Sequence, residues 1–275
     1  MCRADAPGAA RELTCLPYFI IWESKQKHLV FQQVLQVRRL SAEWQRSALH
    51  MILYLYRRGA QGINVKLKDF DGTEINGMGP DISPENVESL MQKLDTLTSE
   101  DYLVLAGSIP GSMPKMIYRD IMARLASKGV QFVVDATGEL LMNVLEYHPF
   151  LIKPNNHELG EIFGVELKTR DEVQPYAKKL QEMGARNVLV SMAGQGAVLL
   201  DENGGFHQLP APKGTLVNAV GAGDSMVAGF VAGWIEKQDY EHAFRMGISA
   251  GSASAFSELL ATEAEIRQVY ASIEA

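Results

Sequence analysis

A glycine-rich stretch near the end of the sequence has the composition of an anion-binding turn. Its residues, Asn218-Ala219-Val220-Gly221-Ala222-Gly223-Asp224, lead directly into the run Ser225–Phe230. When a glycine turn opens a helix, its N–H groups point outward at the positive end of the helix dipole and attract a phosphate. Asp224 falls in the first helical turn, where a carboxylate can accept the proton of an attacking hydroxyl group. The simpler alternative is that Asp224 caps the helix and that the two glycines only permit the turn.

A second polar segment, Lys153-Pro154-Asn155-Asn156-His157-Glu158, joins a short apolar run to a predicted helix. The Asn155 amide and the Glu158 carboxylate are ligand types that suit a hydrated Mg²⁺ ion, and Lys153 would balance phosphate charge. Taken alone, Glu158 fits better as an ordinary acidic residue of a first helical turn. His157 is interpreted as a solvent-facing helix residue without a chemical role.

Further small or polar residues follow other predicted strands. The loop Ser191-Met192-Ala193-Gly194-Gln195-Gly196 contains two glycines and, taken alone, is typical of a hairpin turn. Gly107-Ser108-Ile109-Pro110 follows another strand, and Asp135 ends a third. Lys66 lies in the alternating stretch 63–68 and, taken alone, is an exposed lysine of an edge strand.

The hydrophobic pattern from residue 101 onward predicts short apolar strands that alternate with helices. This order indicates an α/β fold with a mainly parallel sheet and helices on both faces. Ligands of such folds bind beyond the carboxyl ends of the strands, where the segments described above lie. The predicted strands are 101–106, 131–135, 150–153 and 187–191, followed by an antiparallel hairpin, 197–200 and 206–209, at the sheet edge. The predicted helices are 83–97, 114–127, 139–147, one from about 157, 171–183, 223–234 and 240–256.

Residues 1–61 differ in composition from the rest of the chain. They hold nine of the 26 Lys and Arg residues, four of the 33 Asp and Glu residues, and both cysteines. We predict that residues 1–61 are an atypical N-terminal segment and that residues 62–275 form one domain. Apolar residues spaced three to four apart favour a helix within 27–57, and no strand is predicted before residue 62. Residues 62–77 alternate around Asp71-Gly72 and predict a hairpin.

The composition excludes several classes of protein. A chain of 275 residues, 47% of them hydrophobic, can bury a large core. Its net charge of −7 argues against nucleic acid as a partner. The apolar run Leu16–Trp22 is shorter than the roughly 18 residues of a membrane span and lacks the flanks of a signal peptide. Two cysteines exclude a disulfide framework and a cysteine-based zinc site. We therefore expect a soluble cytoplasmic protein that binds neither nucleic acid nor membrane.

Taken together, these motifs resemble those of one family. The strings at 107–110, 153–158, 191–196 and 218–230 are similar to those of the phosphofructokinase B-type, ribokinase-like carbohydrate kinases. They favour the branch that contains 1-phosphofructokinase and tagatose-6-phosphate kinase. The likeness runs from about residue 62 to the C-terminus, and implies a three-layer ribokinase-like fold with a small β lid at about 62–77. A Walker-type nucleotide fold is not indicated, because Gly-x-x-x-x-Gly-Lys-(Ser/Thr) does not occur.

The resemblance also implies roles for individual residues. Asp224 corresponds to the catalytic base, and the N–H groups of Gly221, Ala222 and Gly223 correspond to an anion hole for the transferred phosphate. Mg²⁺ and phosphate would be organised by Asn155, Glu158 and Lys153, with Glu158 holding the metal indirectly. The residues implied in ATP binding are Ser191, Met192, Ala193, Gly194, Gln195, Gly196, Gly223 and Asp224. The residues implied in substrate binding are Lys66, Asn64, Gly107, Ser108 and Asp224.

The implied activity is ATP- and Mg²⁺-dependent phosphorylation of a ketohexose phosphate. Fructose 1-phosphate is the leading substrate and tagatose 6-phosphate the alternative, because the motifs do not separate the two. The branch's Asn-Pro-x-x-Asp and Gly-Gly-Lys-Gly-x-Asn motifs, which belong to its N-terminal strands and substrate site, are absent. A non-catalytic, nucleotide-binding remnant is therefore the rival hypothesis, and a helical interaction arm at 1–61 is the third. Pairing of two copies through the lid is expected where the lid is complete.

Overall fold

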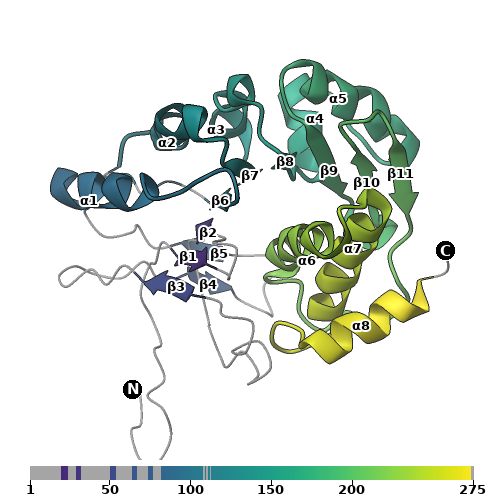
Figure 1. Ribbon diagram of the computed structural model, residues 1–275. Coiled ribbons are helices and arrows are strands. Elements are labelled where there is room, and N and C mark those ends of the chain that lie inside the picture. Colours follow the sequence, from purple (N-terminus) through teal and green to yellow (C-terminus); the bar gives the residue numbers. More distant parts are fainter. Residues whose placement is uncertain are drawn as a thin grey trace, which may run out of the picture.

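The computed structural model describes residues 82–273 except 108, 110 and 112, together with the backbone of five short strands nearer the N-terminus (Figure 1). Those strands are β1 (Ile20–Glu23), β2 (Leu29–Phe31), β3 (His50–Leu53), β4 (Asn64–Lys66) and β5 (Glu74–Asn76). β1 pairs with β3, and β4 pairs with β5, each pair antiparallel. The hairpin predicted at 62–77 is confirmed by the β4–β5 pair.

A seven-stranded sheet of order β11-β10-β9-β8-β7-β6-β2 forms the middle layer. Neighbouring strands from β2 to β9 run parallel, whereas β10 and β11 are antiparallel and complete one edge. The mainly parallel sheet with an antiparallel edge hairpin is therefore confirmed. The remaining strands are β6 (Tyr102–Ala106), β7 (Gln131–Asp135), β8 (Leu151–Ile152), β9 (Asn187–Ser191), β10 (Ala197–Leu200) and β11 (Phe206–Leu209).

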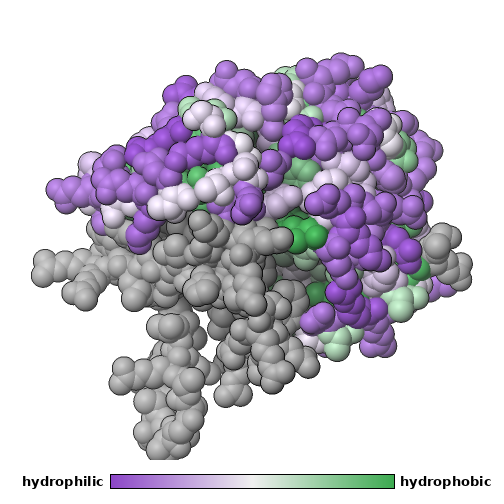
Figure 2. All heavy atoms as spheres, in the orientation of Figure 1, coloured by the Kyte–Doolittle hydropathy of each residue, from purple (hydrophilic) through white to green (hydrophobic). Residues whose placement is uncertain are grey.

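Helices cover both faces of this sheet (Figure 1). Alternate strand residues point to opposite faces, so Val134 packs in the cluster with the earlier helices and Val133 in the cluster with the later ones. One face carries α1 (Pro84–Leu94), α2 (Ile117–Leu125), α3 (Gly138–Met142), α4 (Asn156–Phe163) and α5 (Arg170–Glu182). The other carries α6 (Ala222–Lys237) and α7 (Tyr240–Ala255), and α8 (Glu263–Ser272) packs on α7. The outer surfaces of these helices are mostly hydrophilic (Figure 2).

Local sequence signals set several helix ends. Ser83 caps α1 by accepting the Asn86 N–H, and Pro84 stands in the first turn. Thr169 and Glu172 form a reciprocal capping box at the start of α5. Gly129 ends the segment after α2 with a φ of 73°, which an L side chain rarely adopts. Helix starts predicted from such residues are therefore close to those found.

Two expectations fail. The helix predicted within 27–57 is wrong at Leu29–Phe31 and His50–Leu53, which are strands, and Ile20–Glu23 is a third strand. The backbone of β2 pairs with β6, so pairing with a distant strand overrides the local periodicity. The sequence reasoning also missed α8, although Thr262 and Glu265 form a capping box at its start.

None of the helices that the structure describes is long and apolar enough to cross a membrane.

Candidate active site

The carboxyl ends of the parallel strands bring the predicted polar residues to one edge of the sheet. The register aligns Ala106 of β6 with Asp135 of β7, and the Gly107 N–H donates to the Asp135 carbonyl at 3.1 Å. The chain after β8 runs beside the end of β9, where Asn155 and Ser191 form a parallel bridge. Segments that are far apart in the sequence therefore meet at this edge, as a parallel sheet requires.

The glycine turn at the start of α6 reaches the same edge. Gly221 has a φ of 79°, in the left-handed region that favours glycine, and its carbonyl accepts the Ser225 N–H at 2.8 Å. The Ala222 N–H donates to the Ala219 carbonyl at 3.2 Å within the turn. Asp224 is exposed in the first turn of the helix. A carboxylate on the rim of a helix N-terminus is accessible to a reacting hydroxyl group.

Lys153 lies directly beside this turn. A Cβ atom built on Gly223 would be in ordinary van der Waals contact with Lys153 Nζ, at 3.4 Å, so the ammonium group lies about one methyl group away from the turn. The Lys153 side chain is 8% exposed, and its Nζ is 3.1 Å from Asp135 Oδ1. Burial raises the pKa of the Asp135 carboxyl, and the neighbouring Lys153 opposes that rise. A positive charge and the end of a helix dipole thus meet in one small volume, which suits a bound anion.

Asn155 and Glu158 form the capping box of α4. Asn155 Oδ1 accepts the Glu158 N–H at 2.8 Å, and Glu158 Oε2 accepts the Asn155 N–H at 2.8 Å. Burial raises the pKa of the Glu158 carboxyl, whereas the Asn155 N–H and the charge of Lys153 lower it. Glu158 is therefore a capping residue of the first helical turn, as the simpler interpretation has it, and its role in holding Mg²⁺ stays a prediction.

The donor set fits a hydrated Mg²⁺ ion better than a protein-caged metal. Within residues 82–273, apart from 108, 110 and 112, no group of three or more His, Cys, Asp or Glu side chains could hold a metal ion. Glu158 and Asp135 interact electrostatically, as the contribution of Asp135 to the raised pKa of Glu158 indicates. Mg²⁺ commonly uses few carboxylates and keeps several waters or phosphate oxygens. Glu158 is the residue that would hold such an ion, together with phosphate oxygens.

The Ser191–Gly196 loop has a fixed backbone conformation. The Met192 N–H donates to the Gly196 carbonyl at 2.8 Å, which closes the loop, and the Met192 side chain is buried. A Cβ atom on Gly196 would lie 2.0 Å from the Leu209 carbonyl oxygen, so a side chain cannot fit there. Ala193 adopts a φ of 46°, a left-handed conformation that is uncommon for alanine. The Ser191–Gly196 loop is thus a tight turn with a defined backbone conformation at the carboxyl end of β9.

The predicted substrate residues are only partly described. Gly107 has a φ of 85°, and its carbonyl accepts the Tyr118 hydroxyl at 3.1 Å, so the start of its loop is held in place. Ser108 lies outside the described residues. Asn64 and Lys66 are in β4, opposite Asn76 and Glu74 of β5, and their side chains lie outside the description.

Two residues near the site were missed by sequence reasoning. The Tyr118 hydroxyl donates to the Ala106 carbonyl at 2.7 Å as well as to that of Gly107. Ser254, buried in α7, donates to Ser225 Oγ at 2.8 Å, one residue after Asp224. Neither residue carries a local signal, because each acts through a contact with a distant part of the chain.

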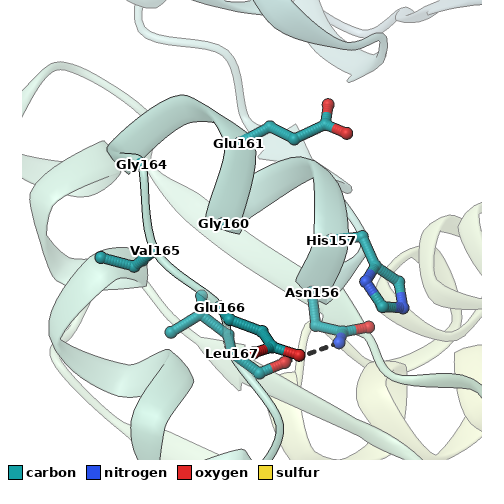
Figure 3. Close-up of a pocket in the computed structure, with 8 residues that line it drawn as sticks. All are labelled: Asn156, His157, Gly160, Glu161, Gly164, Val165, Glu166 and Leu167. Carbon is teal, nitrogen blue, oxygen red and sulfur yellow. Dashed lines mark hydrogen bonds between the residues drawn. The ribbon is translucent and has the colours of Figure 1, made fainter.

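An open pocket of about 290 Å³ lies between α4 and the segment 164–167 that follows it (Figure 3). Asn156 donates to the Leu167 carbonyl at 2.7 Å across it, while the His157 and Glu161 side chains point away from that contact. His157 is exposed, which confirms its interpretation as a solvent-facing residue. Neither Glu158 nor Lys153 lines this pocket, so it is separate from the site at the sheet edge.

Comparisons with known proteins agree with this arrangement. A model of the pfkB family of carbohydrate kinases matches residues 50–266. A 1-phosphofructokinase of Bacillus subtilis is 49% identical over 77% of this chain and 70% of its own length. A D-tagatose-1-phosphate kinase of Bacillus licheniformis is 30% identical over 78% of this chain and 71% of its own length. The crystal structure of phosphofructokinase-2 from Escherichia coli in complex with potassium superposes with a TM-score of 0.69 at 27% identity, covering 78% of this chain and 70% of that one.

The chain is shorter than these relatives. It spans 70%, 65% and 63% of the length of the 1-phosphofructokinases of Bacillus subtilis, Borreliella burgdorferi and Vibrio cholerae.

Proposed function

Because this chain belongs to the pfkB family of carbohydrate kinases, we propose that it transfers the γ-phosphate of ATP to a ketohexose phosphate. Fructose 1-phosphate is the proposed acceptor and fructose 1,6-bisphosphate the product. The observation that carries the proposal is the position of the buried Lys153 ammonium against Gly223, in the turn that leads to Asp224. A fixed cation, outward N–H groups and an accessible carboxylate are the parts that phosphoryl transfer to a hydroxyl group needs.

In the proposed mechanism, the C6 hydroxyl oxygen of the sugar attacks the γ-phosphorus while its proton passes to the Asp224 carboxylate. The bond between the γ-phosphorus and the oxygen bridging to ADP breaks, and ADP leaves with that electron pair. The N–H groups of Gly221 and Gly223 would hold the transferred phosphoryl group, and Lys153 would balance its charge. The Ala222 N–H, expected as a third donor, instead donates to the Ala219 carbonyl within the turn. Glu158 would hold a Mg²⁺ ion indirectly, and that ion would supply further charge neutralisation.

ATP is proposed to lie between the α6 turn and the Ser191–Gly196 loop. In support, exposed apolar side chains flank the turn, and Leu260 reaches to within 2.7 Å of the position of a Cβ atom on Gly221. Apolar side chains of this kind can pack against a planar base. The other exposed apolar residues nearby in sequence are Leu216, Val217, Val220 and Leu259.

Substrate binding is proposed to use the lid and the β6 loop. Lys66 would pair with the phosphate that the sugar already carries, and Asn64, Gly107 and Ser108 would contact the sugar. We propose that residues 62–275 form the kinase domain, with residues 62–77 as its lid. Two copies would pair through these lids, and the enzyme would act in the cytoplasm, where both substrates occur.

Two other candidates follow from specific observations. D-Tagatose phosphates are candidate acceptors because a relative of this chain is named for one of them. Nucleotide binding without turnover is the candidate from another class, because the sequence lacks the Asn-Pro-x-x-Asp and Gly-Gly-Lys-Gly-x-Asn motifs of the branch.

The test is ADP release by the purified chain with Mg²⁺, ATP and, in parallel, fructose 1-phosphate, tagatose 6-phosphate or tagatose 1-phosphate. Asp224→Ala is the blank, since it should abolish sugar-dependent release and leave ATP binding intact. Release that survives in Asp224→Ala would refute the assigned base. ATP binding without release on any of the three sugars would instead favour the non-catalytic candidate.

A further inference from the structure

Asp135 and Lys153 form an ion pair beneath the α6 turn, at the carboxyl ends of β7 and β8. The two side chains are 17% and 8% exposed, and Oδ1 and Nζ are 3.1 Å apart. The backbone of each residue is tied to the sheet, because the Asp135 carbonyl accepts the Gly107 N–H and the Lys153 N–H donates to the Val134 carbonyl, both at 3.1 Å. The pair is therefore anchored at both ends by strands.

We propose that Asp135 is a positioning residue that holds the Lys153 ammonium against Gly223, where the transferred phosphoryl group is stabilised. This role rests on the proposed kinase function. It assigns to Asp135 an action through Lys153, without contact with either substrate.

The need for such a residue follows from the chemistry of lysine. Its ammonium group stands on a flexible four-carbon stem, and ordering that stem has an entropic cost. Lys153 has two acidic neighbours, because its charge also lowers the pKa of Glu158. Lys153 Nζ lies 3.1 Å from Asp135 Oδ1, so the contact with Asp135 restrains the ammonium group beside the Gly223 turn.

The burial of Asp135 supports the same role. An ionised carboxylate is costly to bury unless a positive partner faces it. A methyl or amide group at the same position would avoid this cost, so a purely structural end of β7 does not require a carboxylate. Burial raises the pKa of Asp135 and Lys153 opposes that rise, so the ionised form of Asp135 is stabilised by Lys153.

A double-mutant cycle on the full chain tests the proposal. The variants are Asp135→Asn, Lys153→Met and the double variant, assayed for kcat and KM of ATP with the best sugar phosphate. Asp201→Asn is the matched control, because Asp201 is also a buried acid, with Oδ2 2.7 Å from His207 Nε2, but lies where β10 meets the start of β9. Thermal unfolding of every variant separates loss of folding from loss of positioning.

We expect Asp135→Asn to lower kcat on the order of 10²-fold, the size of effect that a displaced catalytic group produces. In the Lys153→Met background, Asp135→Asn should change kcat no further, because the group it positions is gone. Asp201→Asn should lower the Tm and leave kcat within about twofold. If Asp135→Asn alone fails to fold, the double variant, in which both charges are removed, still tests the proposal, because a kcat below that of Lys153→Met would overturn it.

Three results would overturn the proposal. They are wild-type kcat in Asp135→Asn, a further loss of kcat when Asp135→Asn is added to Lys153→Met, or equal losses in Asp135→Asn and Asp201→Asn. If the wild-type chain binds ATP but phosphorylates none of the three sugars, the kinase function fails, and calorimetric affinity for ATP replaces kcat in the same cycle. A wild-type chain that binds no ATP would overturn both proposals.

Discussion

Gly223 offers a substitution that should separate catalysis from stability. The residue lies in the first turn of α6 with an ordinary, negative φ, so alanine fits its backbone without strain. The added Cβ atom would meet Lys153 Nζ at 3.4 Å and Cε at 3.7 Å. Both distances are ordinary van der Waals contacts, so the methyl group fits without a shift of Lys153. The methyl group would nevertheless occupy the space between the turn and the ammonium group.

Gly223→Ala should therefore leave folding intact and impair turnover. Alanine gains up to about 1 kcal/mol of helix propensity over glycine, which corresponds to a Tm rise of about 2–4 °C in a chain of this size. The same methyl group keeps a phosphate away from the Gly223 N–H, and loss of one such donor costs about 10²–10³ in rate. The expected result is an unchanged or higher Tm with kcat/KM for ATP about 10²-fold lower.

Gly229→Ala is the matched control on the same helix. Its Cβ atom would lie 2.6 Å from the Met246 carbonyl oxygen and 2.6 Å from Ala250 Cβ, so α6 and α7 would have to separate. Overpacking of this kind costs about 1–3 kcal/mol, offset by about 1 kcal/mol of helix propensity. We expect a lower Tm and a smaller kinetic effect than in Gly223→Ala.

The assay is thermal unfolding and steady-state ADP release on both variants. Wild-type kcat/KM in Gly223→Ala would refute the close approach of phosphate to this turn. A Tm loss in Gly223→Ala as large as that in Gly229→Ala would refute the account of the packing.

The remaining predictions concern stability. Gln238, at the C-terminal end of α6, adopts a φ of 51°, so Gln238→Gly should raise stability by about 0.5–1 kcal/mol in urea unfolding; a lower midpoint would contradict this account. Burial raises the pKa of Glu158, so its ionised form opposes folding above that pKa, and stability should fall as pH rises through the window between its ordinary value of 4.5 and the raised value. Glu158→Gln should remove this pH dependence, and its free energy of unfolding at pH 7 should be at least that of the wild type. A lower free energy of unfolding would show that the capping hydrogen bond of the carboxylate contributes more than its burial costs.

The sequence predicts the elements that local signals define. The strand predicted at 131–135 has its observed bounds, because four apolar residues, Val130 and residues 132–134, lie between the turn at Gly129 and the polar Asp135. The turn that begins α6 is also predicted from the sequence, because glycines followed by an acidic residue form a local pattern at the start of a helix. The helix predicted at 29–31 is wrong because these residues form strand β2. That strand is stabilised by pairing with β6, which is too distant in the sequence for local patterns to indicate.

The site shows the same limit. The residue types at Lys153, Glu158 and Asp224 indicate phosphate chemistry from the sequence alone. The contact between Asp135 and Lys153 could not be predicted from the residues, because it depends on the register of β7 beside β8. Tyr118 was missed for a related reason, since its hydroxyl group crosses from α2 to two carbonyls at the end of β6.

The close packing of α6 on α7 has a consequence for motion. Gly229 and Gly233 of α6 meet α7, and Gly247 and Gly251 of α7 meet α6, so the two backbones approach each other with few side chains between them. Helices in such contact cannot rock independently, and their amide hydrogens should exchange with solvent in a single cooperative opening. Asp224, at the start of α6, therefore moves together with α6 and α7. Its position relative to the site is set by how this pair of helices packs on the sheet.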